Sequence, residues 1–267
     1  MSNPELPAEL LDVAVDAATR AGALLRDGRP ADLGVAATKS SPVDVVTEMD
    51  LASEKLIVEL IGTRRPDDGY LGEEGADRPG TSGVRWVVDP LDGTVNYLYG
   101  LPSWGVSVAA ELDGVAVVGV VAVPARDELF HAVLGGGAFL NGQPVSCRPA
   151  PPWGQALVGT GFNYVQHARV HQAEVLHALM SEVRDIRRAG AAAVDLCDVA
   201  AGRLDAFYER GLQPWDMAAG VLIAREAGAR SGGRPGEEPN GGLAVTAPPG
   251  TFESLQTRLE ELGAWHD

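Results

Sequence analysis

The feature that most constrains the fold of this 267-residue chain is a buried strand that ends on paired carboxylates, within residues 86–100 (WVVDPLDGTVNYLYG). An apolar run leads into Asp89 and Asp92, which lie three positions apart around a Pro-Leu turn. Two like charges that lie close together in a poorly solvated place repel each other. A stable fold must therefore supply a group that neutralises them.

The chain as a whole is strongly acidic, with 37 Asp and Glu against 21 Lys and Arg and a formal net charge of −16. This charge argues against general binding to nucleic acids or anionic membranes, because both need positive charge on the protein. It is compatible with a phosphorylated small molecule, provided that a cation mediates the contact. We therefore expect a small-molecule partner and neither a nucleic acid nor a membrane.

The cysteines and the apolar stretches indicate the cellular compartment in which the protein is expected. Cys147 and Cys197 lie far apart and in no paired motif, which argues against a disulfide scaffold or a zinc ribbon. The N-terminal segment is acidic and shows no signal-peptide pattern. The longest apolar stretch, residues 114–124, is too short to span a bilayer. These features together predict a cytoplasmic protein.

The first half of the chain combines helices with a block of strands. An amphipathic helix is expected over residues 8–27, since apolar residues recur at helical spacing: Leu11, Ala14, Val15, Ala18, Ala21 and Leu25. A second helix is expected to begin at or near Asp50, because a carboxylate is favoured at a helix N-terminus. Residues 84–145 show mostly strand patterns, with a strong hairpin signal at Asn141-Gly142.

The proline-rich residues 148–155 indicate a boundary between two parts of the chain. After this segment, short strands alternate with helices up to a final helix near residues 250–262, a pattern typical of α/β structure. We therefore expect an α+β part at residues 1–147, with most of the candidate site residues. An α/β part is expected at residues 155–267, with Asp216.

Several carboxylates lie at the ends of predicted elements instead of on helix faces: Asp50, Glu73, Glu74, Asp89, Asp92 and Asp216. Taken singly, each is adequately explained as a helix cap or a turn residue. Taken together, oxygen ligands from several segments, with few histidines and no cysteine ligand, suit Mg²⁺. Two such ions, about 4 Å apart, would both activate a water and stabilise a leaving oxygen. We therefore expect metal ions to neutralise Asp89 and Asp92.

Three segments in this order, GEEG, WVVDPLDGTVNYLYG and PWDMAAG, resemble the inositol monophosphatase family. The similarity continues through KSSPVDVVTEMD, GGGAFLNG, AAAVDLCDVAAGRLDAFYERG and IAREAGA, and covers most of residues 38–230. The resemblance implies the layered α-β-α-β-α sugar-phosphatase fold, with the active site between its α+β and α/β parts. It also implies a homodimer and inhibition by lithium, which can replace a catalytic Mg²⁺.

The resemblance further implies two or three Mg²⁺ ions in each active site. Around the first ion it places Glu73, Asp89, the Leu91 carbonyl and Thr94. Around the second ion it places Asp89, Asp92 and Asp216, and a third, weaker ion would share Glu73.

The remaining implied roles concern the attacking water and the substrate. Thr94, hydrogen-bonded to Asp50, would act with Glu73 to orient and deprotonate the water that attacks phosphorus in line. The residues implied to contact the substrate are Gly93 and Thr94 through backbone N–H groups on the phosphate, Ala192 and Glu209 on the polyol hydroxyls, and Asp216.

The sequence departs from the family pattern at two places. Residues 190–193 read Gly-Ala-Ala-Ala where a serine is common, which bears on the substrate pocket, and Tyr97 stands where phenylalanine is frequent. Lys39 and Asp44 match the Lys-Ser-Ser-Pro-x-Asp segment of the family. For these two residues, a structural role in positioning the loop is at least as well supported as a direct role in the chemistry.

The expected function is that of a Mg²⁺-dependent phosphoric monoester hydrolase. Inositol 1-phosphate is the favoured substrate, because Asn96 and an aromatic residue at position 97 resemble the inositol branch and Glu209 suits a polyol. Histidinol phosphate and fructose 1,6-bisphosphate are the alternatives. A different class is an interaction or regulatory protein on a phosphatase scaffold, but such a protein has no physical need for these carboxylates together with Thr94.

Overall fold

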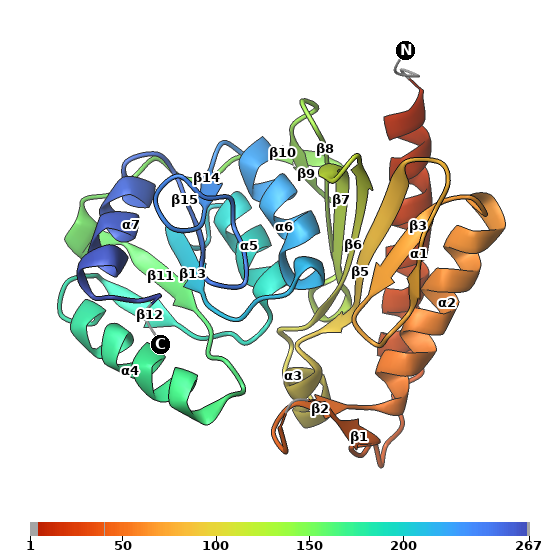
Figure 1. Ribbon diagram of the computed structural model, residues 1–267, viewed down its shortest axis with the longest axis horizontal. Helices are drawn as coiled ribbons and strands as arrows, with labels where there is room; N and C mark the ends of the chain where they lie inside the picture. Colours follow the sequence, from red (N-terminus) through yellow and green to blue (C-terminus); the bar gives the residue numbers. More distant parts are fainter. Residues whose placement is uncertain (1–4, 40, 266–267) are drawn as a thin grey trace.

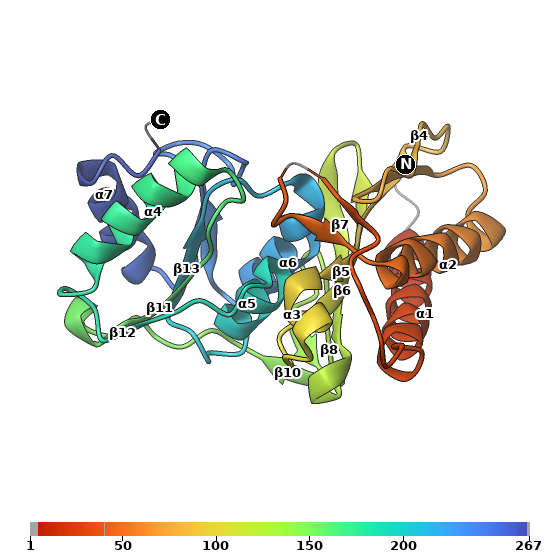
Figure 2. The ribbon, with the colours of Figure 1, turned by 90° about the horizontal axis from the view of Figure 1, so that it is seen from below.

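The protein folds into five alternating layers of helix and sheet in a computed structural model, which describes residues 5–39 and 41–265 (Figure 1). This arrangement confirms the predicted layered α-β-α-β-α fold. Seen from below, the layers stand side by side across the molecule (Figure 2). In order, they are α1 (Leu6–Asp27) with α2 (Glu48–Arg64), an eight-stranded sheet, α5 (Ala192–Ala200) with α6 (Pro214–Glu226), a five-stranded sheet, and α4 (Gln166–Leu179) with α7 (Thr251–Glu261).

The eight-stranded sheet carries the segment that ends on the paired carboxylates. Its strand order is β10-β9-β8-β7-β6-β5-β3-β4, and all neighbours are antiparallel except β3 and β5. Its strands are β3 (Gly69–Gly72), β4 (Asp77–Arg78), β5 (Val84–Asp92), β6 (Gly105–Leu112), β7 (Val115–Val123), β8 (Glu128–Val133), β9 (Ala138–Leu140) and β10 (Gln143–Val145). Asn141 and Gly142 both have positive φ in the turn between β9 and β10, which confirms the predicted hairpin.

Helices α1 and α2 cover one face of this sheet. The fully buried side chains of α1 are Leu10, Val13, Ala14, Ala17, Ala18, Ala21 and Leu25, whereas Leu11 and Val15 are only partly buried. Four of the six residues of the predicted apolar face, Ala14, Ala18, Ala21 and Leu25, are therefore confirmed, and Leu11 and Val15 lie at the edge of the packed face. The reason is that small alanines, and not the two larger residues, allow the helix to approach the sheet closely.

Helices α5 and α6 fill the space between the two sheets. Their apolar residues share one core with Val121 and Phe130 of the large sheet and with Phe207 of the small sheet. A side chain at Gly119 of β7 would lie within 2.8 Å of the Ala219 carbonyl oxygen, so α6 packs directly on the strand backbone. The predicted division at residues 148–155 stays a prediction, while this shared core shows that the two parts are packed against each other.

The five-stranded sheet has the order β12-β11-β13-β15-β14. Strand β11 is parallel to both β12 and β13, whereas β15 is antiparallel to β13 and β14. The strands are β11 (Leu157–Thr160), β12 (Asp185–Arg187), β13 (Ala206–Glu209), β14 (Arg230–Gly232) and β15 (Ala244–Ala247). Helices α4 and α7 cover its outer face through residues such as Leu179 and Leu255.

Three short elements lie near one end of the molecule. The two-stranded pair β1 (Ala37–Thr38) and β2 (Val45–Val46) and the helix α3 (Thr94–Tyr99) meet there below the large sheet (Figure 1). The remaining elements are the 3₁₀ turns η1 (Pro124–Arg126) and η2 (Trp153–Gln155). Within residues 5–39 and 41–265, no helix is both long and apolar enough to cross a membrane.

Candidate active site

A pocket of about 520 Å³ lies at the end of β5, beside the starts of α3, α5 and α6, and it gathers residues that are far apart in the sequence. Nine of the ten residues to which the family resemblance assigns a role line it: Glu73, Asp89, Leu91, Asp92, Gly93, Thr94, Ala192, Glu209 and Asp216. Asp50 is the exception, since it is fully buried behind Thr94. The structure therefore brings the predicted residues together, while their chemical roles stay predictions.

Strand β5 places Asp89 and Asp92 through a β-bulge and not through a turn. Asp89 pairs with Ser107 and Asp92 pairs with Gly105, so Pro90 and Leu91 lie opposite a single residue of β6. The predicted Pro-Leu turn was wrong, because the strand continues to Asp92. Proline has no N–H to give to the ladder, and a bulge accommodates that gap. The Leu91 N–H instead donates to Asp89 Oδ1 at 3.0 Å.

Asp92 connects the large sheet to the middle helical layer. Its carboxylate accepts hydrogen bonds from the backbone N–H of Ala192 at 3.1 Å and of Ala193 at 2.8 Å. These residues form the first turn of α5, whose N–H groups have no partner within the helix. The partial positive charge at a helix N-terminus also favours a carboxylate there. Asp92 is thus held at its place from across the pocket.

Asp216 lies in the first turn of α6 on the far side of the pocket. Its Oδ2 accepts the Gln213 N–H at 2.6 Å in a capping box. Pro214 occupies the first position of the helix, where its missing N–H costs no hydrogen bond. The segment predicted from Pro-Trp-Asp therefore begins a helix whose N-terminus faces the other carboxylates.

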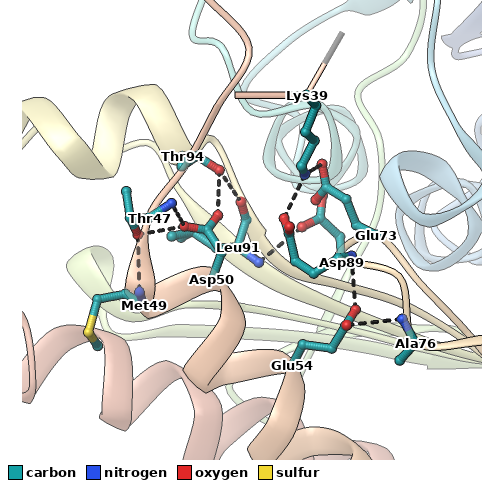
Figure 3. A network of polar contacts seen from close by, with 11 residues as sticks. Lys39, Thr47, Met49, Asp50, Glu54, Glu73, Ala76, Asp89, Leu91 and Thr94 are labelled. Carbon is teal, nitrogen blue, oxygen red and sulfur yellow. Dashed lines mark hydrogen bonds and ion pairs between the residues drawn. The ribbon is translucent and has the colours of Figure 1, made fainter. Parts of the chain in front are cut away.

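Thr94 and Asp50 form a hydrogen-bonded pair at the start of α3 (Figure 3). The Thr94 hydroxyl lies 2.8 Å from Asp50 Oδ1 and 3.1 Å from the Leu91 carbonyl oxygen. Asp50 Oδ2 accepts from the N–H of Thr47 at 2.8 Å and from its hydroxyl at 2.5 Å. Asp50 is the third residue of α2, which confirms its predicted place near the start of a helix, and its capping box with Thr47 holds Oδ2 while Thr94 holds Oδ1.

Glu73 projects from a turn that Glu54 of α2 supports from below (Figure 3). The buried Glu54 carboxylate accepts the N–H of Glu74 at 3.0 Å and of Ala76 at 3.1 Å. On the pocket side, Lys39 Nζ lies 2.7 Å from Glu73 Oε1 and 2.6 Å from Glu74 Oε1. Lys39 therefore neutralises part of the negative charge of this turn.

Burial and mutual repulsion raise the pKa values of the acidic groups in the pocket. Burial raises the pKa of Asp89, and the charges of Glu73, Asp92 and Asp216 raise it further. Burial also raises the pKa of Asp92 to about 7, although the backbone N–H donors of α5 oppose this effect. Burial and the charge of Glu73 raise the pKa of Asp216 in the same way. A cluster of carboxyl groups whose pKa values are raised in this way is typical of a functional site.

The donor set of this pocket fits a hard divalent cation. Glu73, Asp89, Asp92 and Asp216 supply carboxylate oxygens, and Leu91 adds a carbonyl oxygen. Oxygen-only sets of this kind suit Mg²⁺. Among residues 5–39 and 41–265, however, no three His, Cys, Asp or Glu side chains already lie close enough to enclose an ion. The pocket is thus open and acidic, and a cation would draw the four carboxylates closer.

We expect the protein without divalent ions to become more stable as the pH falls from 8 to 6. Because the pKa of Asp92 is raised to about 7 by burial, the folded state takes up a proton in this range that the unfolded state does not. Each such group contributes on the order of 1 kcal/mol, which raises Tm by a few degrees. Mg²⁺ at pH 8 should also raise Tm, because it binds only the folded state.

Thermal unfolding at pH 6 and pH 8, with EDTA or Mg²⁺, measures both effects. The matched control is Asp92→Asn, in which the pH effect should shrink because this carboxyl no longer titrates. A Tm that falls on acidification from pH 8 to 6, or that Mg²⁺ leaves unchanged, would contradict the electrostatic account.

Several pocket residues were not predicted from the sequence. They are Asn163, Tyr164, Arg188, Arg210 and Gln213, which line the pocket from the loops of the C-terminal part. Each follows the end of a strand or precedes a helix, which is where binding residues concentrate. Polar residues at strand ends were the only signal in the sequence, and many surface loops share it.

Comparison with known proteins gives a consistent result. The model of the inositol monophosphatase family matches residues 6–262. Inositol-1-monophosphatase SuhB of Mycobacterium tuberculosis is 44% identical, over 95% of this chain and 94% of that protein. Nus factor SuhB of Escherichia coli is 41% identical, over 82% of this chain and 83% of that protein. The crystal structure of extragenic suppressor protein suhB from Bartonella henselae has a TM-score of 0.88 at 37% identity, covering 94% of this chain and 98% of that one.

Proposed function

The chain belongs to the inositol monophosphatase family, and on that premise we propose that it hydrolyses inositol 1-phosphate to inositol and phosphate. The observation that carries the proposal is the convergence of four carboxylates on one pocket, together with Thr94, which Asp50 holds from behind. Acidic groups from β5, from α6 and from the turn after β3 repel one another, so the fold alone gives no reason for them to meet in one pocket. A reaction that needs bound cations supplies such a reason.

The residues that would hold Mg²⁺ are Glu73, Asp89, Asp92 and Asp216, with the Leu91 carbonyl and Thr94 completing one position. When bound, two or three such ions lower the pKa of water and stabilise a departing oxygen. The family is generally metal-dependent, which agrees with the donor set of the pocket. Lys39 holds Glu73 through an ion pair that a cation at this position would replace.

Thr94 and Glu73 would orient the attacking water and accept its proton. The Thr94 hydroxyl donates its hydrogen to Asp50 Oδ1, so its lone pairs face away from Asp50 and can accept a hydrogen bond from water. Asp50 keeps this orientation because Thr47 occupies its other oxygen. A fixed hydrogen-bond acceptor next to the reacting centre increases the reaction rate by positioning the water and by taking part in proton transfer.

The phosphate would lie against the backbone at the start of α3. Gly93 has φ +85°, and a side chain there would lie within 2.9 Å of the Ser103 carbonyl oxygen. Only glycine therefore lets this backbone come close to a phosphate group, which the N–H groups of Gly93 and Thr94 would bind. Asp216, which the family pattern also places beside the substrate, lies across the pocket.

Ala192 and Glu209 would contact the hydroxyl groups of the inositol ring. Both line the pocket, and burial together with the charge of Asp216 raises the pKa of Glu209. A carboxyl group in this setting can accept hydrogen bonds from two neighbouring hydroxyls. The alanine at position 192 leaves space for the ring beside the first turn of α5.

We expect Mg²⁺-dependent phosphate release to be fastest from inositol 1-phosphate in a panel with histidinol phosphate, fructose 1,6-bisphosphate and 3′-phosphoadenosine 5′-phosphate. The ratio of kcat/KM values measures this preference, and EDTA should remove activity on all four. A clear preference for another compound would change the proposed substrate and leave the proposed reaction class unchanged. No release from any of them would overturn the proposed hydrolysis.

A second candidate is a role in protein–protein interaction, because the relative from Escherichia coli is named Nus factor SuhB. The two roles make different demands on the pocket. An interaction role would survive Asp216→Asn, whereas hydrolysis would not. The retention of every carboxylate of the family pattern favours the enzyme.

For its assembly and compartment we propose a cytoplasmic homodimer, as the family resemblance and the two unpaired cysteines, Cys147 and Cys197, suggest. Exposed apolar side chains at the end of α3, Tyr99 and Leu101, could take part in such an interface. Light scattering of the full chain in solution would give its mass directly.

A further inference from the structure

Arg188 follows strand β12 and lines the candidate active site. Three cationic side chains line this pocket, and two of them already have hydrogen-bond or ion-pair partners in the protein. Lys39 pairs with Glu73 and Glu74, and Arg210 Nε donates to the Gly242 carbonyl oxygen at 3.1 Å. The Arg188 guanidinium makes no hydrogen bond or ion pair with any other residue in 5–39 and 41–265. A free guanidinium beside so many carboxylates is unexpected in a chain with net charge −16.

The neighbouring Arg187 shows that pairing is readily available at this edge of the sheet. Arg187 Nη1 donates to Asp185 Oδ2 at 2.6 Å and to the Ile186 carbonyl oxygen at 2.8 Å. Arg187 does not line the pocket, whereas Arg188 does. The difference between the two arginines is therefore one of direction, and Arg188 is the one directed to the substrate side.

The backbone after Arg188 leaves space for its guanidinium group. Gly190 has φ +91°, and a side chain there would lie only 2.4 Å from Arg188 Nη1. Asn96 Nδ2 donates to the Ala189 carbonyl oxygen at 2.8 Å and so fixes this loop to α3. The guanidinium consequently lies against the loop that leads to Ala192, the residue proposed to contact the leaving inositol. In agreement, its charge lowers the pKa of Glu209 against the stronger effect of burial.

We propose that Arg188 recognises a second anionic group on the leaving part of the substrate. This inference rests on the proposed phosphomonoesterase activity and extends its substrate class. The enzyme would act on polyol monophosphates and, between two phosphomonoesters of the same polyol, would favour the one whose leaving group carries a further phosphate or carboxylate. A guanidinium binds such groups through two parallel hydrogen bonds and stays charged at every working pH.

The chemistry of the pocket separates the two anions of such a substrate. The phosphate that is cleaved would lie at Gly93 and Thr94, where the carboxylates require a cation to hold it. The second anion would lie at Arg188, which needs no cation because it is itself positive. A neutral polyol would leave Arg188 in water and gain little from it, since a solvated guanidinium already has its hydrogen bonds.

The test compares fructose 1-phosphate with fructose 1,6-bisphosphate, which differ by one phosphate group. Arg188→Met keeps the length of the side chain and removes its charge, and Arg187→Met is the matched control outside the pocket. In the Arg188→Met protein, the ratio of kcat/KM for the bisphosphate to that for the monophosphate should fall about tenfold or more, mainly through KM. Arg188→Lys should recover part of the loss, and Arg187→Met should leave the ratio unchanged.

An unchanged ratio in Arg188→Met, or an equal loss for both compounds, would overturn the inference and leave the proposed hydrolysis intact. If the wild-type protein hydrolyses neither compound, phosphate release from inositol 1-phosphate tests the proposed function separately. Calorimetric titration of the same two compounds into the wild-type and Arg188→Met proteins then decides the inference. A selective loss of bisphosphate affinity in Arg188→Met would support it, and equal affinities in the two proteins would overturn it.

Discussion

The Asp216→Asn protein should release phosphate at least about a hundredfold more slowly than the wild type while keeping its fold. Asn keeps an oxygen that can still accept the Gln213 N–H, so the cap of α6 survives. What the substitution removes is one of the negative charges that would hold a cation. Phosphate release at saturating substrate over a range of Mg²⁺ concentrations measures the loss, and thermal unfolding checks the fold.

Asp92→Asn should have the same effect on turnover, because this carboxylate faces Asp216 across the pocket. The matched control is Asp205→Asn. Asp205 is also buried and also accepts a backbone N–H, that of Leu157 at 2.8 Å, but it does not line the pocket. The control should keep near-wild-type turnover. Full activity in both Asp92→Asn and Asp216→Asn would show that these carboxylates hold no essential cation.

Thr94→Val should lower kcat by roughly a hundredfold to ten-thousandfold with little change in KM. Valine has the shape of threonine, so the packing of α3 is kept. It cannot donate to Asp50 or accept a hydrogen bond from water, so the attacking water loses its orientation. Steady-state kinetics of phosphate release measure the loss, and Thr94→Ser, which keeps the hydroxyl, should recover much of the activity.

The pairing of Thr94 with Asp50 can be tested separately by a double-mutant cycle. If the two side chains act as a unit, Asp50→Asn combined with Thr94→Val should be about as slow as the slower single variant. Losses that multiply would mean that Asp50 acts independently of Thr94. In that case, the 2.8 Å hydrogen bond between them would have only a structural role.

The elements with strong local patterns could be predicted from the sequence. Asp50 was placed near the start of a helix, and the structure shows it as the third residue of α2 in a capping box. The hairpin at Asn141-Gly142 and the helix after Pro214 were equally readable, because turn and cap chemistry depend on neighbouring residues. The gathering of the site residues followed from the family resemblance and from the rule that binding residues lie at element ends.

The features that could not be predicted depend on contacts between distant segments. Asp92 caps α5, about 100 residues away in the sequence, and nothing near either segment indicates this bond. The continuation of β5 through Pro90 depends on its pairing with β6, so a local reading gave a turn. The packed face of α1 depends on the sheet that it covers. Arg188 is one of several exposed arginines until the fold shows which of them lines the pocket.

The paired carboxylates of β5 are only partly neutralised by the protein itself. Backbone N–H groups of α5 stabilise Asp92, and the Leu91 N–H stabilises Asp89, yet the pKa of both stays raised by burial. Lys39 pairs with Glu73 and Glu74 and leaves Asp216 without a cationic partner at ion-pair distance among residues 5–39 and 41–265. The charge that remains is the physical basis for expecting a bound cation.

The most direct test of this account is phosphate release from inositol 1-phosphate as Mg²⁺ is removed with EDTA and then restored. We expect release to stop on removal and to return when Mg²⁺ is added in excess, because the pocket carboxylates need cations to bind a phosphate at all. Release that continues without divalent ions, or no release at any Mg²⁺ concentration, would contradict the central claim that this acidic pocket is a metal-dependent phosphatase site.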